Sequence, residues 1–554
     1  MIYYLLLILC GIIMILFGQI DDIFGIHIIP NIGWSYEFTK TVFFIIALNI
    51  IFLCFIWKRN PIFIPKYVPL LYIIIILTTF FSLSPLTSLI GWVSKWHGML
   101  FFLSLLHLHI IIYNLPKIRQ KWLLQCFLYI SPLICLFAVW QFFLPSFDYG
   151  NLENRALGSF GHPNYLAGYI LLLLPIISII PHKIYRVIIW VMLVVTLLLT
   201  KSAWALLIAL CYGIYISKKY ISWTMIYIWV LLVSAIIVWV LYEFSFWVKL
   251  HSFLARFFIW ETTLSIIFSD IKIFLFGAGF ETLPLLFDSY KSEYLYIFEN
   301  IWFRADRPHN IFLNIWYSSG VLWLWVLGYI YYQIKKYSHL KPNIYWNALI
   351  LFGVFLVFNY ASVVHMIIVS LIFCLALWKN IPVYHSKLST VVKISISIII
   401  LMIIYLIWSV YTAEIHAKNY EYQKASQSFP LPGYLYKIWA YETGKKYEWF
   451  ESETYYISQI VHHRETLSPC ENLVGKYPTV ENYFYCGELL EWVWETESAI
   501  DFYIRWLDIL PNLWEDDSEY YNNIFIQYFF DGRRFYSERY SRLSNILYKV
   551  KTER

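Results

Sequence analysis

The stretch VVKISISIIILMIIYLIWSVY, residues 391–411, decides the fold because Lys393 is its one charged side chain. A helix rises about 1.5 Å per residue, so about 20 such residues cross a hydrocarbon core of about 30 Å. Similar apolar blocks recur along the whole chain before this one. The sequence therefore predicts a protein that spans a membrane many times.

Composition supports the same interpretation. Hydrophobic residues make up 60% of the chain and charged residues 14%, with a mean hydropathy of +0.62. A soluble domain carries about 25% charged residues, so a wholly soluble globular class is excluded. We expect about 12–13 transmembrane helices in an all-α polytopic membrane domain, residues 1–411. The expected spans are 2–18, 40–57, 68–83, 98–115, 123–144, 165–181, 187–200, 203–217, 222–242, 310–333, 345–360, 363–378 and 391–411.

The connectors between these blocks alternate in charge. One set contains lysine and arginine but no aspartate or glutamate, and every acidic residue lies in the other set or in the tail. The positive-inside rule places the basic set in the cytoplasm. We therefore expect the N-terminus inside, and residues 19–39, 84–97, 145–164, 243–309 and the tail from 412 outside. The basic connectors are 58–67, 116–122, 182–186, 218–221, 334–344 and 379–390.

The formal net charge of +6 does not indicate a nucleic-acid partner. Basic residues of the first 411 positions lie mostly in short connectors, so no basic stripe is left to follow a phosphate backbone. The eight cysteines show no CxxC motif and no Cys/His metal spacing. Cys470 and Cys486, both in the tail, would pair only if the tail faces an oxidising compartment. No metal or cofactor is predicted.

From Thr412 the chain becomes charged and aromatic, which predicts a soluble tail domain, residues 412–554. Within it, AIDFYIRWLDILPNLW (499–514) has helical apolar spacing closed by Pro511. This segment resembles the second half of a tetratricopeptide repeat, a TPR-like pattern whose usual role is to hold a peptide or protein. An ordinary pair of amphipathic helices fits the segment about as well. We expect a C-terminal soluble α-helical domain on the outer side.

Cationic side chains in the outer segments indicate an anionic substrate. An arginine fork forms paired, charge-assisted hydrogen bonds with phosphate and stays ionised at any ordinary pH. The alternative is that interfacial lysine and arginine bind no substrate and only reach toward lipid headgroups. The candidates for binding a substrate diphosphate are Arg155, Arg256, Arg304, Arg307, Lys95 and Lys201.

His309 is the candidate for proton transfer, because an imidazole exchanges protons near neutral pH. Asp306 precedes it by three residues, and a helix over these positions would place both side chains on one face. Asp306 would then orient the imidazole. His97 and His162 fit structural or interfacial roles better, and Gly277 and Gly279 fit a turn or tight helix packing.

At these residues the chain resembles the O-antigen ligase family, bacterial envelope glycosyltransferases that share the Wzy-C region. The match covers roughly residues 80–375. GSFGHPNYLAG (158–168), with Gly158 and Asn164, looks like the family's glycine, aromatic, Asn-Pro-Asn-x-x-Ala pattern, and His162 stands in place of the first asparagine.

Two further motifs carry the resemblance. Arg256-x-x-x-Trp260, followed by Gly277-x-Gly279, is similar to the family's approach to its large external loop, here 243–309. Asp306-x-x-His309-Asn310 is similar to the family's Asp-x-x-His-Asn signature. The chain departs at Lys201 and Lys95, which occupy places where the family commonly has arginine.

The resemblance implies a glycosyltransferase C-like membrane fold and a metal-independent reaction. A glycan passes from a polyprenyl (undecaprenyl) diphosphate carrier to an acceptor hydroxyl on the outer face of the bacterial cytoplasmic membrane. His309 would be the base, supported by Asp306, and Arg155, Arg256 and Arg307 would neutralise the leaving diphosphate.

Several activities remain open at this point. Within the family, ligation to lipid, transfer to protein hydroxyls and polymerisation of repeat units look alike in sequence. The tail slightly favours a protein acceptor or partner. From another class, a lipid-linked glycan flippase or transporter would share the span count, although such proteins typically show internal repeats and mid-membrane ionisable groups.

Overall fold

The computed structural model describes ten segments of the chain and three residues of the tail. These are residues 2–15, 36–59, 61–91, 96–143, 155–217, 246–292, 294–295, 305–337, 344–376 and 383–418, with Glu471, Asp501 and Arg505. The chain divides into two compact units. Unit 1 comprises Met1–Lys249, Asp270–Thr282 and His309–Tyr411, and unit 2 comprises Leu250–Ser269, Leu283–Pro308 and Thr412–Arg554.

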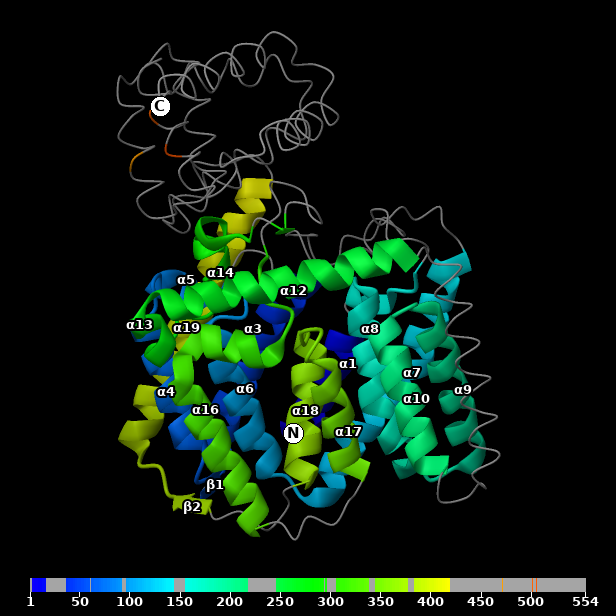
Figure 1. Cartoon of the computed structure of the whole chain (residues 1–554). Coiled ribbons are helices and arrows are strands. Elements are labelled where there is room, and N and C mark those ends of the chain that lie inside the picture. Colours follow the sequence, from blue (N-terminus) through cyan, green and yellow to red (C-terminus); the bar gives the residue numbers. More distant parts are fainter. Residues whose placement is uncertain are drawn as a thin grey trace, which may run out of the picture. The chain divides into compact units, whose positions relative to one another are not determined.

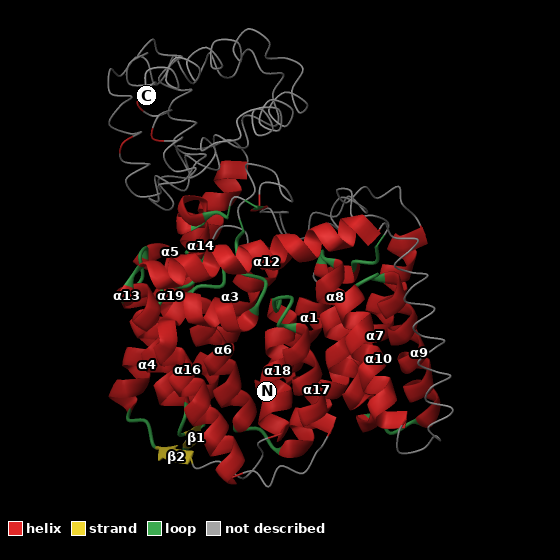
Figure 2. Ribbon diagram, in the orientation of Figure 1, coloured by secondary structure: helices red, strands yellow, loops and turns green. Residues whose placement is uncertain are grey.

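Helices make up nearly all of the described chain (Figures 1 and 2), which confirms the expectation of an α-helical protein. A helix lies in each expected span within the described residues, whereas 222–242 lies outside them. The helices are α1 (Ile2–Ile15), α3 (Tyr36–Lys58), α4 (Val68–Phe80), α5 (Pro85–Ile90), α6 (Met99–Tyr113), α7 (Lys117–Phe143), α8 (Pro163–Leu173), α9 (Lys183–Leu199), α10 (Ala203–Ser217), α12 (Phe246–Ser269), α13 (Ile271–Phe276), α14 (Leu283–Leu286), α16 (Ile311–Tyr337), α17 (Ile344–Phe355), α18 (Val363–Ala376) and α19 (Thr390–Lys418). Short 3-10 helices lie at Gly158–Phe160, Leu174–Ile179 and Asp288–Tyr290.

Among the described residues, three helical stretches are long and apolar enough to cross a membrane alone: Lys40–Lys58, Lys117–Phe143 and Thr390–Thr412. The two parts of α16, Ile311–Val321 and Trp323–Tyr332, make a fourth candidate if they form one span bent by 109°. The other apolar helices are shorter, at 10–17 residues.

Helix α8 lies at the core of unit 1. All its residues from Leu166 to Leu173 are buried, as expected for a helix that is apolar on every side. Helix α17 packs against α8, α10 and α18, while α6 packs against α3, α4 and α18. Several helices therefore surround α8 and hold its N-terminal end in place.

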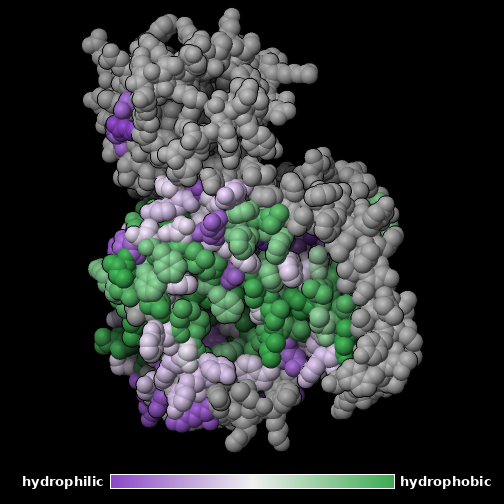
Figure 3. Space-filling model, viewed as in Figure 1, coloured by the Kyte–Doolittle hydropathy of each residue, from purple (hydrophilic) through white to green (hydrophobic). Residues whose placement is uncertain are grey.

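The outer faces of several helices expose large apolar side chains. On α9, Ile184 is 75% exposed, and on α19 Val391 is 72% and Tyr405 73% exposed. Figure 3 shows hydrophobic residues across the middle of unit 1 on the visible face, and hydrophilic residues near β1 and β2. Continuous apolar surface of this kind is unfavourable in water.

A two-stranded antiparallel sheet joins two connectors that are far apart in sequence. Strand β1 (Ile62–Pro65) pairs with β2 (Val383–Ser386), with Ile62 opposite Ser386. These strands were not predicted from the sequence. We call this end of unit 1 the strand end. The other end, the loop end, comprises residues 82–91, 96–98, 155–165, 199–202, 277–282, 309–311 and 356–365.

Helix α16 is broken at Gly320, whose φ of 70° and ψ of −175° are not helical. Backbone N–H groups of the segment after α13 satisfy the carbonyls at the break. Ala278 donates to the carbonyl oxygen of Tyr317 (2.7 Å), and Gly279 donates to that of Ser318 (2.9 Å). A Cβ on Gly277 would lie 2.2 Å from the Ser318 oxygen, so only glycine allows this crossing.

The expected large external loop, 243–309, is not an irregular loop where the structure describes it. Helix α12 fills its first part, and α13, α14 and a 3-10 turn follow. No helix was predicted there from the sequence, because charged residues such as Arg256 and Glu261 interrupt the apolar positions of α12. In unit 2, Thr262 Oγ1 accepts from the Ser292 backbone N–H (3.0 Å), and Ser292 Oγ donates to Glu261 Oε2 (2.9 Å).

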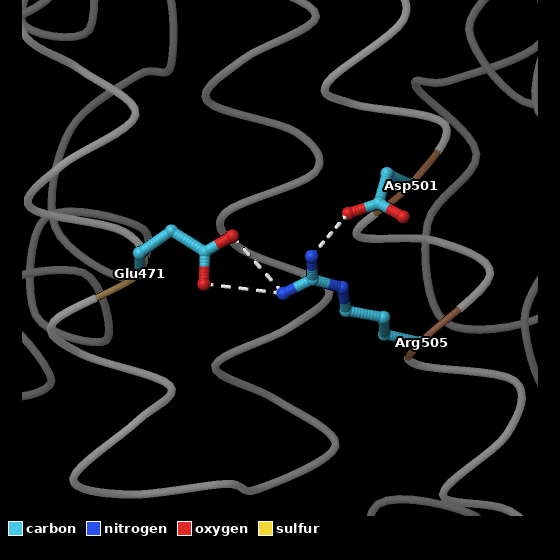
Figure 4. A network of polar contacts seen from close by, with 3 residues as sticks. All are labelled: Glu471, Asp501 and Arg505. Atoms are coloured by element: carbon cyan, nitrogen blue, oxygen red, sulfur yellow. Dashed lines mark hydrogen bonds and ion pairs between the residues drawn. The ribbon is translucent and has the colours of Figure 1, made fainter.

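The tail contributes three described residues, which form one ionic network (Figure 4). Arg505 Nη1 lies 3.0 Å from Glu471 Oε1, and Nη2 lies 2.7 Å from Asp501 Oδ2. Asp501 and Arg505 are four residues apart, the spacing at which helical side chains meet. The possible Cys470–Cys486 pair and the TPR-like assignment fall outside the described residues.

Candidate functional site

Arg155 is held at the loop end by two neutral oxygens. Its Nε donates to the carbonyl oxygen of Thr200 (2.8 Å), and its Nη2 donates to Asn164 Oδ1 (3.3 Å). Ser202 Oγ donates to the same Asn164 oxygen (2.9 Å). These two bonds fix the orientation of the guanidinium. Two residues nominated from the sequence, Arg155 and Asn164, are thus in direct contact.

Lys201 lies between Thr200 and Ser202, so it belongs to the same cluster. Its φ is +53°, which a non-glycine residue rarely adopts. Its Nζ lies 5.3 Å from the centroid of the Phe142 ring. The left-handed backbone turns the chain sharply from α9 into α10 and leaves the lysine beside Arg155's anchoring carbonyl.

The turn before α8 carries Gly158 with a φ of +58°, and its N–H donates to Gln141 Oε1 (2.9 Å). His162 caps α8, since its Nδ1 accepts from the Asn164 N–H (3.2 Å). Pro163 follows at the first helical position, where a missing N–H is harmless. The structural role expected for His162 is therefore the role that the geometry gives it.

Lys40 reaches this turn from α3, although sequence reasoning did not single it out. The residue is buried, and its Nζ donates to the carbonyl oxygen of Ser159. The same Nζ lies 5.1 Å from the centroid of the Phe160 ring, a cation–π distance. Its only signal in the sequence was a lysine at the start of an apolar block.

His365, on α18, bonds the first turn of α8 through Nε2 and the residue before α18 through Nδ1. Its Nδ1 accepts from the Ser362 backbone N–H (2.9 Å), so Nε2 carries the proton that it shares with the Tyr165 carbonyl oxygen (2.9 Å). A Cβ on Gly168 would lie 3.1 Å from that Nε2. His365 is fully buried, and its partners fix one neutral tautomer, so it serves the structure.

His309 is half-buried and packs edge-on against Tyr360, with ring centroids 5.0 Å apart. Tyr360 in turn packs edge-on against Tyr165 at 4.9 Å. Tyr165 is the neighbour of Asn164, which accepts from Arg155. The candidate base and the candidate diphosphate ligand thus belong to one continuous cluster at the loop end, joined through two tyrosines that sequence reasoning missed.

The expected helical pairing of Asp306 with His309 is wrong. Helix α16 begins at Ile311, after both residues, and His309 has a φ of +54°. Pro308 disfavours helix at the residue before it, and Asn310 stops the helix from extending backwards. Asn310 Oδ1 accepts from the N–H groups of Phe312 (2.9 Å) and Leu313 (3.2 Å), so Asn310 is the cap of α16.

Five further nominated residues lie in unit 2 or outside the described residues. Asp306, Arg307 and Arg256 belong to unit 2, whereas Lys95 and Arg304 lie outside the described residues. Arg307 is buried, and burial lowers the pKa of Arg256 on α12.

Gly277 and Gly279 are structural glycines in this protein. Gly277 allows the crossing of α13 and α16, and a Cβ on Gly279 would lie 1.9 Å from Ser82 Oγ. Nearby, Glu281 Oε2 accepts from the His97 N–H (3.0 Å), and the His97 ring stacks on Phe101 at 4.3 Å. His97 therefore lies in a packed setting, in line with its expected structural role.

The loop end combines a fixed guanidinium, a lysine, hydroxyl and amide groups, and an imidazole next to tyrosine. Such a set can bind an anion and move a proton in one place. Models of protein families, curated proteins and solved structures were each searched, and none matches this chain.

Proposed function

We propose that this chain is a multi-pass membrane glycosyltransferase of the O-antigen ligase type. It would transfer a glycan from a polyprenyl diphosphate carrier to an acceptor hydroxyl at its loop end. One observation carries the proposal: Arg155, Gly158 and Asn164 were nominated from one segment and Lys201 and His309 from two others, and all five lie at the same end of unit 1. His309 and Lys201 also have positive φ, a backbone strain that clusters at functional sites.

Membrane insertion is supported by the exposed apolar faces of α9 and α19, which would contact lipid rather than water. Contacts between connectors also respect the two sides predicted from charge. The basic connectors 58–67 and 379–390 pair with each other through β1 and β2. Arg155, predicted outside, and Ser202, between the expected spans 187–200 and 203–217, both donate to Asn164. The loop end would then face the outside of the cytoplasmic membrane.

The proposed chemistry is a substitution at the first sugar's anomeric carbon. The acceptor oxygen forms a bond to that carbon as the carbon–oxygen bond to the diphosphate breaks. His309 takes the proton from the acceptor hydroxyl, and the electron pair leaves with the polyprenyl diphosphate. Arg155 and Lys201 stabilise the charge that develops on the leaving diphosphate. Asn164 and Thr200 keep the guanidinium oriented during this step.

The test is reconstitution of the full chain in liposomes with a polyprenyl diphosphate glycan. Removing a general base lowers rates about 10²- to 10⁴-fold, so we expect a loss of that size for His309→Ala. The matched control is His182→Ala, which should keep the wild-type rate. His182 is exposed and lies before α9, in the basic connector 182–186. Unchanged transfer by His309→Ala would overturn the assignment of the base.

The same preparation distinguishes the alternatives within and outside the family. Lipid, a protein or a second glycan donor is offered as acceptor in separate reactions, and the product identifies ligase, protein oligosaccharyltransferase or polymerase. A flippase would instead move the labelled donor between leaflets without forming a new glycosidic bond. Translocation without transfer would reject the proposal.

A further inference from the structure

Pairing of β1 and β2 brings the cations of two distant connectors together at the strand end. Lys58, Arg59 and Lys66 flank β1, and Lys387 and Lys393 follow β2. Neither connector, 58–67 or 379–390, contains an aspartate or glutamate. The sheet therefore concentrates positive charge from both connectors, and no carboxylate in either one compensates it.

Aromatic rings lie among these cations at cation–π distances. Lys66 Nζ is 5.6 Å from the centroid of the Tyr384 ring, and Lys393 Nζ is 5.9 Å from that of Trp57. Trp57 Nε1 donates to Ser397 Oγ on α19 (3.0 Å), which fixes the indole next to Lys393. Trp57 is 49% and Tyr384 52% exposed. Exposed tryptophan and tyrosine with a polar edge are typical of the boundary between headgroups and acyl chains.

An apolar stripe begins one residue after Lys393. Ile394, Ile398 and Leu401 recur at helical spacing on α19, and they are 46%, 53% and 57% exposed. The surface is thus cationic at the strand pair and apolar along α19. A free anion would use the first part alone, whereas an amphiphile with an anionic head would use both.

We propose that the strand end of unit 1 binds an anionic phospholipid. Its phosphate would contact Lys387 and Lys393, and its acyl chains would lie along Ile394, Ile398 and Leu401. Lys66, at the Pro65–Val383 end of the strand pair, would add to the positive potential. The proposal rests on the membrane insertion in the proposed function, but not on glycan transfer. Basic sites between helices on the cytoplasmic side suit lipid headgroups, and each lysine near the surface contributes about fivefold in affinity.

The test titrates full-length protein in neutral detergent with dioleoyl phosphatidylglycerol and follows both thermal unfolding and bound lipid by native mass spectrometry. Phosphatidylglycerol should raise the unfolding midpoint, and dioleoyl phosphatidylcholine should not. The triple variant Lys66→Gln, Lys387→Gln, Lys393→Gln should bind phosphatidylglycerol on the order of 100-fold more weakly. The control Lys117→Gln, Lys121→Gln, Lys183→Gln removes the same charge elsewhere and should keep wild-type binding.

Two further measurements complete the test. The first distinguishes a phospholipid from free phosphate, and the second tests membrane insertion. Inorganic phosphate or short-chain dihexanoyl phosphatidylglycerol should shift the midpoint far less than the dioleoyl lipid, and an equal shift would overturn the role of the apolar stripe. Equal binding by both triple variants would overturn the proposal. Release of the protein from membranes by alkaline carbonate would reject membrane insertion itself, and glycan transfer measured separately shows whether the proposed activity stands.

Discussion

The two ends of unit 1 are built in different ways. Every positive-φ residue among those the structure describes lies at the loop end or at the α16 break that contacts it, including Trp96, Lys201, Glu281 and His309. The strand end has regular backbone and a hydrogen-bonded strand pair, with its cations on the surface. Strained backbone and buried polar groups occur where chemistry is proposed, whereas exposed charge and aromatic rings occur where lipid anchoring is proposed.

The largest loss of stability is expected for a substitution at the crossing of α13 and α16, in the loop end. Gly277→Ala places a Cβ 2.2 Å from the Ser318 oxygen at a φ of 82°, so the two backbones must separate. We expect a loss of about 3 kcal/mol or more in unfolding free energy. Gly328→Ala is the matched control, because a Cβ there meets nothing within 4 Å and α16 gains up to about 1 kcal/mol. Thermal unfolding in detergent compares the two, and equal midpoints would contradict the crossing.

The next effect separates two histidines of the loop end. His365→Leu removes the acceptor of the buried Ser362 N–H and the side-chain donor to the Tyr165 carbonyl. Each unsatisfied buried group costs about 1–3 kcal/mol, so the unfolding midpoint should drop clearly. His309→Ala should leave the midpoint nearly unchanged while transfer is lost. Normal stability of the His365→Leu variant would show that these two hydrogen bonds do not stabilise the fold.

Arg155→Lys is expected to have a smaller effect than these variants. Lysine keeps the charge but cannot bond Thr200 and Asn164 at once, so the cation loses its fixed position. We expect kcat/KM for glycan transfer to fall about 10- to 100-fold. Arg119→Lys, an exposed arginine of α7 on the strand side, serves as the control and should show no change. Transfer at the wild-type rate by Arg155→Lys would argue that charge alone is enough.

The smallest effect concerns the strand end. Asn114 Oδ1 accepts from the Phe63 N–H (3.0 Å), and its Nδ2 donates to the Phe63 carbonyl (2.8 Å), which ties β1 to α6. Asn114→Ala should lower the unfolding free energy by about 1 kcal/mol and leave the rate of glycan transfer unchanged. A large loss of transfer by this variant would remove the contrast between the two ends.

Sequence alone predicted the helices of the expected spans well because each of these leaves a continuous apolar block, as in residues 363–378 or 203–217, whereas α12 does not. It also selected Arg155, Asn164, Lys201 and His309, which lie close together in space. These residues stand out because charge, amide and imidazole groups are rare next to apolar blocks. Local composition was sufficient for both results.

What the sequence could not reveal depends on contacts between distant segments. Ile62–Pro65 is too short and too apolar to be recognised as a strand without its partner at 383–386. Lys40 and His365 have their partners at Ser159 and Tyr165, which lie on other elements. Asn310 was nominated within a substrate motif, but its contacts show a helix cap. In each case the partner, rather than the residue type, decides the role.

The strand pair also has a consequence for biogenesis. β1 leaves the ribosome more than 300 residues before β2, since Ile62 pairs with Ser386. At about 5–20 residues per second, β1 waits roughly 15–65 s for its partner. During that time its backbone edge is open to pairing with other chains. The contact between Lys40 and Ser159 can form much earlier. A chain truncated before residue 383 would keep an open strand edge permanently.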